Sequence, residues 1–187
     1  MHVFSRPSFA APASAPQPAP RFTPGTFIAA PDGPRAVETL AAGDLVTTPE
    51  GPRRIAATGL RSLPRADWTY RRDLWPVRVP VGSLGNSVPL RLVPEQRVLL
   101  YGQALADAIG EPEVWVAVAT LVGLRGLAVD RPLGALRQHG LALEGGGGAV
   151  QASGAWCDLG ADGAEPDRER IRAAFVAMNA AGEPRLA

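Results

Sequence analysis

A chain of 187 residues with a formal net charge of +1 has the length of one domain, and it carries no charge excess that would indicate a nucleic-acid or anionic membrane partner. Cys157 is the only cysteine and His2 and His139 are the only histidines, which excludes an internal disulfide and argues against a metal site. No apolar run reaches the roughly 18 residues of a membrane span, and no apolar signal-peptide core is seen near the N-terminus. We therefore expect a cytoplasmic protein by default, with no cofactor, no nucleic acid and no membrane partner.

Residues 1–20 form a leader rich in Ala, Pro and Ser that ends Pro16-Gln17-Pro18-Ala19-Pro20. Proline fixes φ and supplies no backbone N–H, so this composition predicts a disordered, polyproline-like segment. We expect three parts in the chain: the leader at 1–20, a β-domain at 21–160, and a C-terminal helix with its tail at 161–187.

From Phe22 onward the apolar runs are short and turn residues are frequent, which is typical of β-strands joined by tight turns. The pattern predicts strands at 26–29, 45–48 and 53–61, and a turn or helical step at 37–40. The last two strands are expected to form a hairpin through Pro49-Glu50-Gly51-Pro52. Residues 63–73 are polar and predict a loop in which Trp68 is an exposed contact.

Residues 75–81 alternate apolar and other residues, and their prolines favour an edge strand. The remaining pattern predicts a helical turn closed by Gly110 at 104–109, a strand or short helix at 115–121, and strands at 90–93, 98–101, 127–129 and 141–143. The other three tryptophans, Trp75, Trp115 and Trp156, are expected to fill the core.

The end of the chain differs from the rest because its apolar residues recur at helical spacing. Pro166 and the acidic Asp167 and Glu169 suit a first helical turn, and Gly182-Glu183-Pro184 suits a stop. The apolar face of this helix would hold Ile171, Ala174, Phe175 and Met178. Many short strands with one convincing helix predict an all-β fold.

Three blocks of sequence carry a resemblance to a known family. They are Arg21-Phe22-Thr23-Pro24-Gly25-Thr26, then Val37-Glu38-Thr39-Leu40 with Gly43-Asp44-Leu45-Val46, and then residues 92–100. Together they resemble the Hint module, the self-cleaving β-domain of Hedgehog proteins and inteins, and especially a bacterial branch of it. The resemblance spans about residues 21–160 and implies a flattened β-module, with residues 137–143 as a paired strand and residues 155–160 as the closing segment.

In active Hint members the first block begins with Cys or Ser, and the third block holds Thr or Ser followed three residues later by His. The matching positions of this sequence hold Arg21, Val93 and Gln96. A guanidinium is no nucleophile at physiological pH, valine has no hydroxyl, and an amide cannot accept and release a proton near neutrality. The resemblance thus implies a Hint scaffold that lacks self-cleavage and serves as a structural or binding module. The emptied pocket, floored by Arg21 and Gln96, could hold an anion or a carboxylate.

Two alternatives stay open at this point. Residual self-processing at or near residue 21 would need Thr23 or Cys157 as nucleophile and His139 as base, although a strand-and-turn threonine, a buried inert thiol and an ordinary polar histidine are the simpler interpretations. The other alternative is an unrelated small β-barrel that binds a small molecule. For a silent module we expect an unidentified protein partner that binds through the Pro-rich leader or the C-terminal helix.

Overall fold

The computed structural model describes residues 18, 19, 21–160 and 167–180. Most of the predicted leader, Pro166 and the predicted helix stop at residues 182–184 lie outside the described residues. The strands are β1 Phe27–Ile28, β2 Arg35–Ala36, β3 Leu45–Thr48, β4 Gly51–Leu63, β5 Val77–Val79, β6 Leu90–Leu92, β7 Arg97–Tyr101, β8 Glu113–Ala117, β9 Ala128–Val129, β10 Leu136–Leu143, β11 Ala149–Ala152 and β12 Ala155–Asp158. The helices are α1 Arg65–Trp68, α2 Gln103–Ile109 and α3 Arg168–Ala180, with 3-10 turns η1 Val37–Thr39, η2 Arg72–Leu74 and η3 Val118–Leu121.

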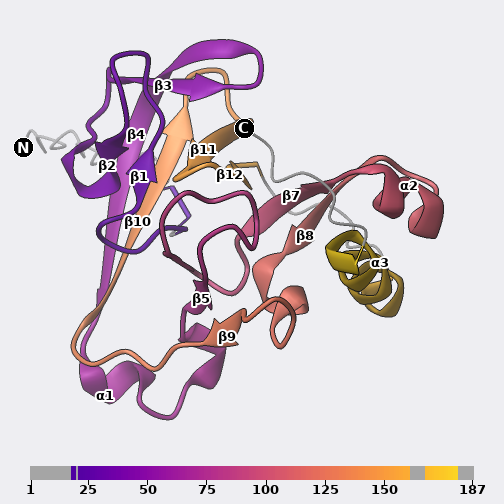
Figure 1. Cartoon of the computed structure of the whole chain (residues 1–187). Helices are drawn as coiled ribbons and strands as arrows, with labels where there is room; N and C mark the ends of the chain where they lie inside the picture. The colour runs from indigo at the N-terminus through magenta and orange to yellow at the C-terminus, as the bar shows by residue number, and fades with distance from the viewer. Residues whose placement is uncertain (1–17, 20, 161–166, 181–187) are drawn as a thin grey trace, which may run out of the picture.

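Within the described residues the strands form three sheets with antiparallel pairing throughout. Their strand orders are β2-β1-β11-β12-β7-β8, β10-β4-β3 and β6-β5-β9. The longest pair, β4 with β10, runs as the purple and orange ribbons along the left of Figure 1, while β7 and β8 extend toward α2 and α3 on the right. The prediction of a mainly β fold is therefore confirmed.

Several predicted elements appear where the sequence places them. The β3–β4 hairpin turns where Thr48 pairs with Gly51, whose φ of 110° lies in a region open to glycine. Gly110 ends α2 in the left-handed conformation, with its N–H donating to the carbonyl of Ala106 at 2.8 Å. The ambiguous stretch at 115–121 contains both alternatives, because β8 passes directly into η3.

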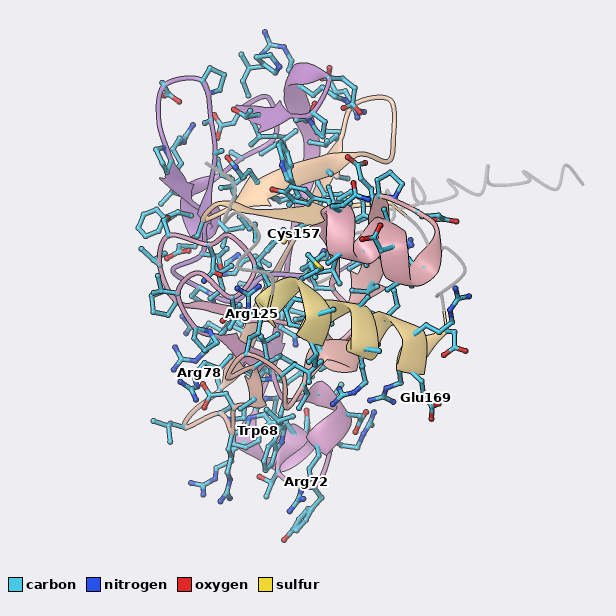
Figure 2. All side chains as sticks on the ribbon, turned by 45° about the vertical axis from the view of Figure 1, so that its right-hand side comes forward. Trp68, Arg72, Arg78, Arg125, Cys157 and Glu169 are labelled. Atoms are coloured by element: carbon cyan, nitrogen blue, oxygen red, sulfur yellow. The ribbon has the colours of Figure 1, made fainter. Side chains whose placement is uncertain are left out.

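The prediction of a loop at 63–73 is wrong, since α1 lies within this stretch and η2 begins there at Arg72. Trp68, expected to be exposed, is only 1% exposed, and Figure 2 shows it beside Arg72, which projects outward. The Trp75 indole N–H donates to the Trp68 carbonyl at 2.9 Å, and the two rings meet edge to face. Trp75, Trp115 and Trp156, expected in the core, are only half-buried. The residues around Trp68 in the sequence are mostly polar, so the hydrophobic pattern gave no sign that its side chain is buried.

The prediction of an edge position for the strand after Trp75 is also wrong. β5 pairs with β6 on one side and with β9 on the other, so it is the central strand of its sheet. Its prolines, Pro76 and Pro80, flank Val77–Val79 and therefore interrupt neither ladder.

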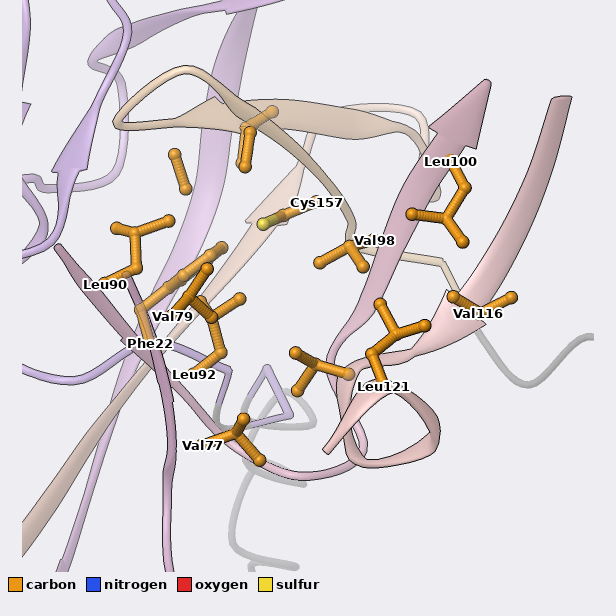
Figure 3. Packing of buried hydrophobic residues seen from close by; sticks show 14 of the residues in the cluster. Phe22, Val77, Val79, Leu90, Leu92, Val98, Leu100, Val116, Leu121 and Cys157 are labelled. Carbon is orange, nitrogen blue, oxygen red and sulfur yellow. The ribbon is translucent and has the colours of Figure 1, made fainter. Parts of the chain in front are cut away.

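One apolar core joins the sheets and the C-terminal helix. Figure 3 shows Phe22, Val98 and Cys157 packed among valines and leucines of β5, β6, β7 and β8. Ile171, Ala174 and Phe175 of α3 belong to the same buried cluster, which confirms the predicted apolar face of that helix. α3 is thus an integral wall of the domain.

Candidate functional site

Phe22 places the first block at the junction of two sheets. Its backbone bridges to Leu92 on one side and to His139 on the other, and its side chain is fully buried. The N–H groups of Arg21 and Phe22 both donate to the His139 carbonyl, at 2.9 and 3.0 Å, and the His139 N–H donates back to the Phe22 carbonyl at 2.7 Å. Arg21 is thereby fixed beside β10.

The third block forms a tight turn over Arg21. The Gln96 N–H donates to the Val93 carbonyl at 2.9 Å, and the Val93 N–H donates to the Arg21 carbonyl at 3.3 Å. The N–H of Val118 in turn donates to the Gln96 carbonyl at 2.9 Å, which ties the turn to η3. The structure therefore brings the three predicted positions, Arg21, Val93 and Gln96, into one place.

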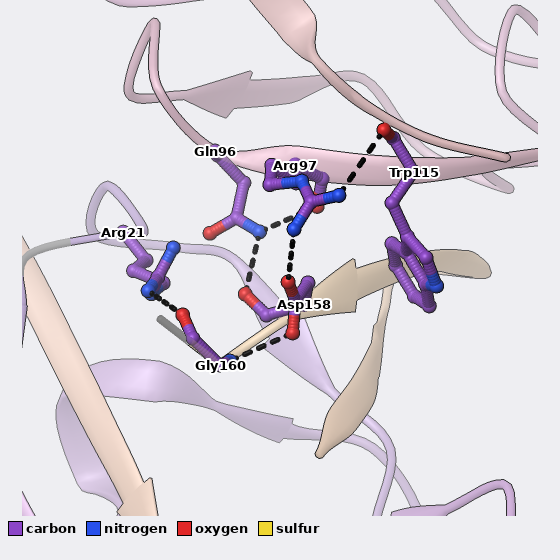
Figure 4. Close-up of polar contacts among 6 residues, drawn as sticks. All are labelled: Arg21, Gln96, Arg97, Trp115, Asp158 and Gly160. Carbon is purple, nitrogen blue, oxygen red and sulfur yellow. Dashed lines mark hydrogen bonds and ion pairs between the residues drawn. The ribbon is translucent and has the colours of Figure 1, made fainter. Parts of the chain in front are cut away.

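Arg21 and Gln96 both direct side-chain donors at the closing segment, residues 155–160 (Figure 4). Arg21 Nη2 donates to the Gly160 carbonyl at 2.6 Å, and Gln96 Nε2 donates to the Asp158 carbonyl at 2.9 Å and to the Arg97 carbonyl at 2.7 Å. The Gly160 N–H donates to Asp158 Oδ1 at 2.7 Å. We call these four residues, Arg21, Gln96, Asp158 and Gly160, the clasp.

A largely buried ion pair supports the clasp, and sequence reasoning missed it. Arg97 Nη1 lies 3.3 Å from Asp158 Oδ2, and their side chains are only 20% and 16% exposed. Arg97 Nη2 also donates to the Trp115 carbonyl at 3.4 Å (Figure 4). The sequence does show a charged residue at one end of each of two short apolar strands. Without knowing which strands pair, however, it gave no reason to expect that Arg97 and Asp158 meet.

Gln96 retains one unsatisfied polar atom. Its side chain is fully buried, and among the described residues no donor reaches Oε1. Both N–H groups of its amide are already donated, so Gln96 offers only an acceptor to any ligand. An acceptor repels a carboxylate, and this weighs against the predicted anion pocket.

Thr23 occupies the turn of the first block. Its hydroxyl donates to the Arg91 carbonyl at 2.9 Å, and its own carbonyl accepts the hydroxyl of Thr26 at 2.8 Å. Gly25, at a φ of 80°, donates its N–H to the Glu38 carboxylate. That hydrogen bond is the largest of the effects that hold the pKa of Glu38 below its usual value. These contacts give Thr23 a structural role.

Cys157 lies in the core behind the clasp. Burial raises the pKa of its thiol to about 12; the nearby charge of Arg21 opposes the shift and that of Asp158 adds to it. The thiolate is the nucleophilic form of cysteine, so Cys157 is held in its unreactive form at neutral pH. Figure 3 shows its sulfur facing apolar side chains.

His139 is near the clasp through its backbone, which pairs with Arg21 and Phe22. Its side chain is half-buried, and burial lowers its pKa below 6.5, with the charge of Glu38 opposing that shift and Arg137 adding to it. The imidazole is therefore neutral at pH 7. The structure thus places Arg21, Val93, Gln96, Cys157 and the His139 backbone close together, near the end of β12.

The described residues hold neither a metal-binding cluster nor a membrane-spanning helix. No group of three or more His, Cys, Asp or Glu side chains in residues 21–160 and 167–180 is arranged to hold a metal ion. In the same part of the chain, no helix has the length and apolar character needed to cross a membrane.

Comparisons with known proteins agree with this architecture. A solved bacterial intein-like domain from Clostridium thermocellum matches with a TM-score of 0.51 at 14% identity, over 75% of this chain and 98% of that chain. The AceL NrdHF class 3 split intein, solved as a GSH-linked splice-inactive variant, matches with a TM-score of 0.49 at 11% identity, over 78% of this chain and 100% of that chain. No curated protein sequence matches the chain. At 14% identity, the likeness to the Clostridium thermocellum domain shows the fold alone.

The sequence itself matches the family model described as the Hint domain over residues 20–163. That span covers most of the chain and contains every element from the first block to the closing segment. It also removes the alternative of an unrelated β-barrel. The chain belongs to the Hint domain family.

Proposed function

We propose that this Hint domain does not cleave its own chain and that it acts as a structural or binding module, a pseudoenzyme within its family. One observation carries the proposal. Arg21 and Gln96, at the positions of the family nucleophile and base, donate to backbone carbonyls of the closing segment. In an active relative the residues at these two positions take part in the chemistry. In this chain Arg21 and Gln96 instead join the first and third blocks to the closing segment.

The chemistry of these side chains supports the same conclusion. Self-cleavage begins with attack by a thiol or hydroxyl on the carbonyl of the preceding residue, and it needs a group that protonates the departing amide nitrogen. Arg21 remains a cation with no nucleophilic atom, and the Gln96 amide does not titrate near neutrality. Val93 contributes its backbone N–H and carbonyl to this turn, and its side chain has no hydroxyl.

The substitute nucleophiles have little support. The Cys157 thiol is fully buried, and burial raises its pKa to about 12, so it stays protonated at pH 7. The Thr23 hydroxyl gives its hydrogen to the Arg91 carbonyl, which is no base. Neither group meets a general base within the geometry described.

One observation favours the second candidate, residual self-processing. His139 is neutral at pH 7 because burial lowers its pKa, so its imidazole could accept a proton, and its backbone pairs with Arg21 and Phe22. This arrangement supplies a base without a nucleophile. We therefore keep self-processing near residue 21 as the alternative that the experiment must test.

The binding role has two candidate surfaces, the leader and α3. The apolar face of α3 is already buried in the core, so a partner of this helix would meet polar residues such as Glu169, which projects outward in Figure 2. The leader is rich in proline, and Pro-rich segments are a common binding target for partner domains. We favour the leader for this reason. A cytoplasmic location stays a prediction.

The test is the intact mass of the full chain with a small reporter domain fused ahead of Met1. The fusion protein is incubated alone, with dithiothreitol and with hydroxylamine, which cleave thioesters and esters. We expect one unchanged mass in all three conditions. A matched control, Thr23→Ala with Cys157→Ala, should give the same result because neither side chain is expected to act.

A fragment boundary at or near residue 21 would contradict the proposal. The single variants Thr23→Ala, Cys157→Ala and His139→Ala would then identify the nucleophile and the base. Loss of the fragments in His139→Ala with retained folding would establish the alternative.

A further inference from the structure

Two glycines lie opposite each other in the long β4–β10 pair, although the strand backbone requires neither. Gly59 and Gly140 are direct cross-strand partners. Neither has a φ in the left-handed region, so other residues could adopt the same backbone conformation. Glycine inside a strand weakens it and often marks a place where another backbone comes close.

The backbone that comes close belongs to the leader of this chain. A Cβ added to Gly140 would lie 2.5 Å from the carbonyl oxygens of both Pro18 and Ala19, a separation that real Cβ atoms essentially never show. A Cβ added to Gly59 would lie 3.3 Å from the Cδ and from the carbonyl oxygen of Pro18. We call Gly59 and Gly140 the glycine saddle, because the leader crosses the sheet where these two side chains are missing.

A buried acceptor lies on the same face of the sheet. Side chains alternate along a strand, so Gln138 faces the same side as Gly140. Gln138 is 2% exposed, and no donor among the described residues reaches its Oε1. This oxygen stays without a donor although Pro18 and Ala19 lie over the neighbouring Gly140, so the contact at the saddle rests on backbone packing and not on this acceptor.

The saddle continues into pairing that is already present. Arg21 and Phe22 pair with His139, the residue next to Gly140. The chain therefore passes over the face of the sheet at Gly140 and joins the edge of β10 one residue away. Proline at position 18 presets φ for an extended backbone, which lowers the entropy lost on docking.

We propose that the glycine saddle is a docking site for an extended, proline-containing peptide backbone, and that its occupant is the leader of this chain at Pro18–Ala19. Docking fixes Pro18 and Ala19 against the sheet just upstream of the clasp. The proposal does not depend on whether the domain cleaves itself, because a cleaving domain and a silent one would hold Pro18 and Ala19 in the same way.

The test is the {¹H}–¹⁵N heteronuclear NOE of the Ala19 amide in the full chain. We expect the wild type to give the high value of ordered backbone at Ala19, and Gly140→Ala to give the low value of a free peptide while signals of β7 and β8 stay unchanged. The matched control is Gly134→Ala, since a Cβ there meets nothing within 4 Å. The same NOE at Ala19 in wild type and Gly140→Ala, or a free-peptide value in the wild type, would overturn the proposal.

A leader variant keeps the proposal testable if Gly140→Ala does not fold. Pro18→Ser alters the docked segment and changes no residue of the sheet. We expect the amide shifts of Gly59 and Gly140 to move while the shift of Gly134 stays in place. Unchanged shifts at Gly59 and Gly140 would show that the leader does not lie on the saddle.

Discussion

The clasp and the glycine saddle hold the same stretch of chain in opposite ways. Downstream of residue 21, the clasp uses side chains that fill space and donate to carbonyls. Upstream of it, the saddle uses missing side chains that let a backbone approach. The clasp should therefore stabilise the folded domain, whereas the saddle should decide only whether the leader can lie on the sheet. We expect mutations in the two regions to have different effects on the free energy of unfolding.

The largest expected effect is in the clasp. Asp158→Ala removes the ion-pair partner of Arg97 and the acceptor for the Gly160 N–H, and we expect it to lower the free energy of unfolding by about 3 kcal/mol. Denaturant unfolding gives the value. The control is Asp130→Ala, whose partner Arg91 is 58% exposed, and it should cost about 1 kcal/mol or less. Equal losses in the two variants would contradict a structural role for the clasp.

The next effect concerns the buried amide. Gln96→Leu removes two hydrogen bonds to carbonyls and also removes the unsatisfied Oε1, so we expect a loss of about 2 kcal/mol. Gln151→Leu is the control, because Gln151 is half-buried and makes one longer bond to the Gly154 carbonyl. It should cost about half as much or less. Equal costs measured by urea unfolding would show that the clasp position is not special.

The saddle should respond weakly in the same measurement. Gly140→Ala adds a methyl group whose nearest neighbours are leader atoms, so the leader can move away and leave the domain intact. We expect the free energy of unfolding to change by less than about 1 kcal/mol. A loss as large as that of Asp158→Ala would mean that the two regions are not distinct.

The smallest effect is a pH dependence from His139. Burial holds its pKa in the folded protein below the ordinary value of 6.5, so the folded state binds its proton less readily than the unfolded state. The contribution of His139 to stability is complete above pH 6.5, and it is lost as the pH falls from 6.5 toward the lower folded-state pKa. The wild type should therefore lose more stability than His139→Gln between pH 7.5 and 5.5 in thermal unfolding. Parallel losses would contradict this.

Strand positions were predictable where alternation and turn residues coincide, as in the β3–β4 hairpin, and the apolar face of α3 followed from helical spacing. The burial of Trp68 was not predictable, because its neighbours are polar and the partner ring lies seven residues away. The position of β5 at the centre of its sheet depends on pairing with distant strands. A sequence pattern reports local preference and not which strands meet.

The candidate site divides in the same way. The resemblance to the Hint blocks predicted that Arg21, Val93 and Gln96 lie at one site, and the structure places them at one turn. Arg97 with Asp158 was missed because its members lie 61 residues apart. The glycine saddle was missed too, although glycine inside a predicted strand was a visible signal of close backbone approach.

Arg21 and Gln96 are proposed to hold the domain together at the positions that match the family nucleophile and base. The free energy of unfolding of the double variant Arg21→Met with Gln96→Leu is the measurement of choice, since each replacement leaves an apolar side chain at the position and removes the donor. We expect the free energy of unfolding to fall by about 3 kcal/mol or more relative to the wild type. Stability equal to or above that of the wild type would contradict it.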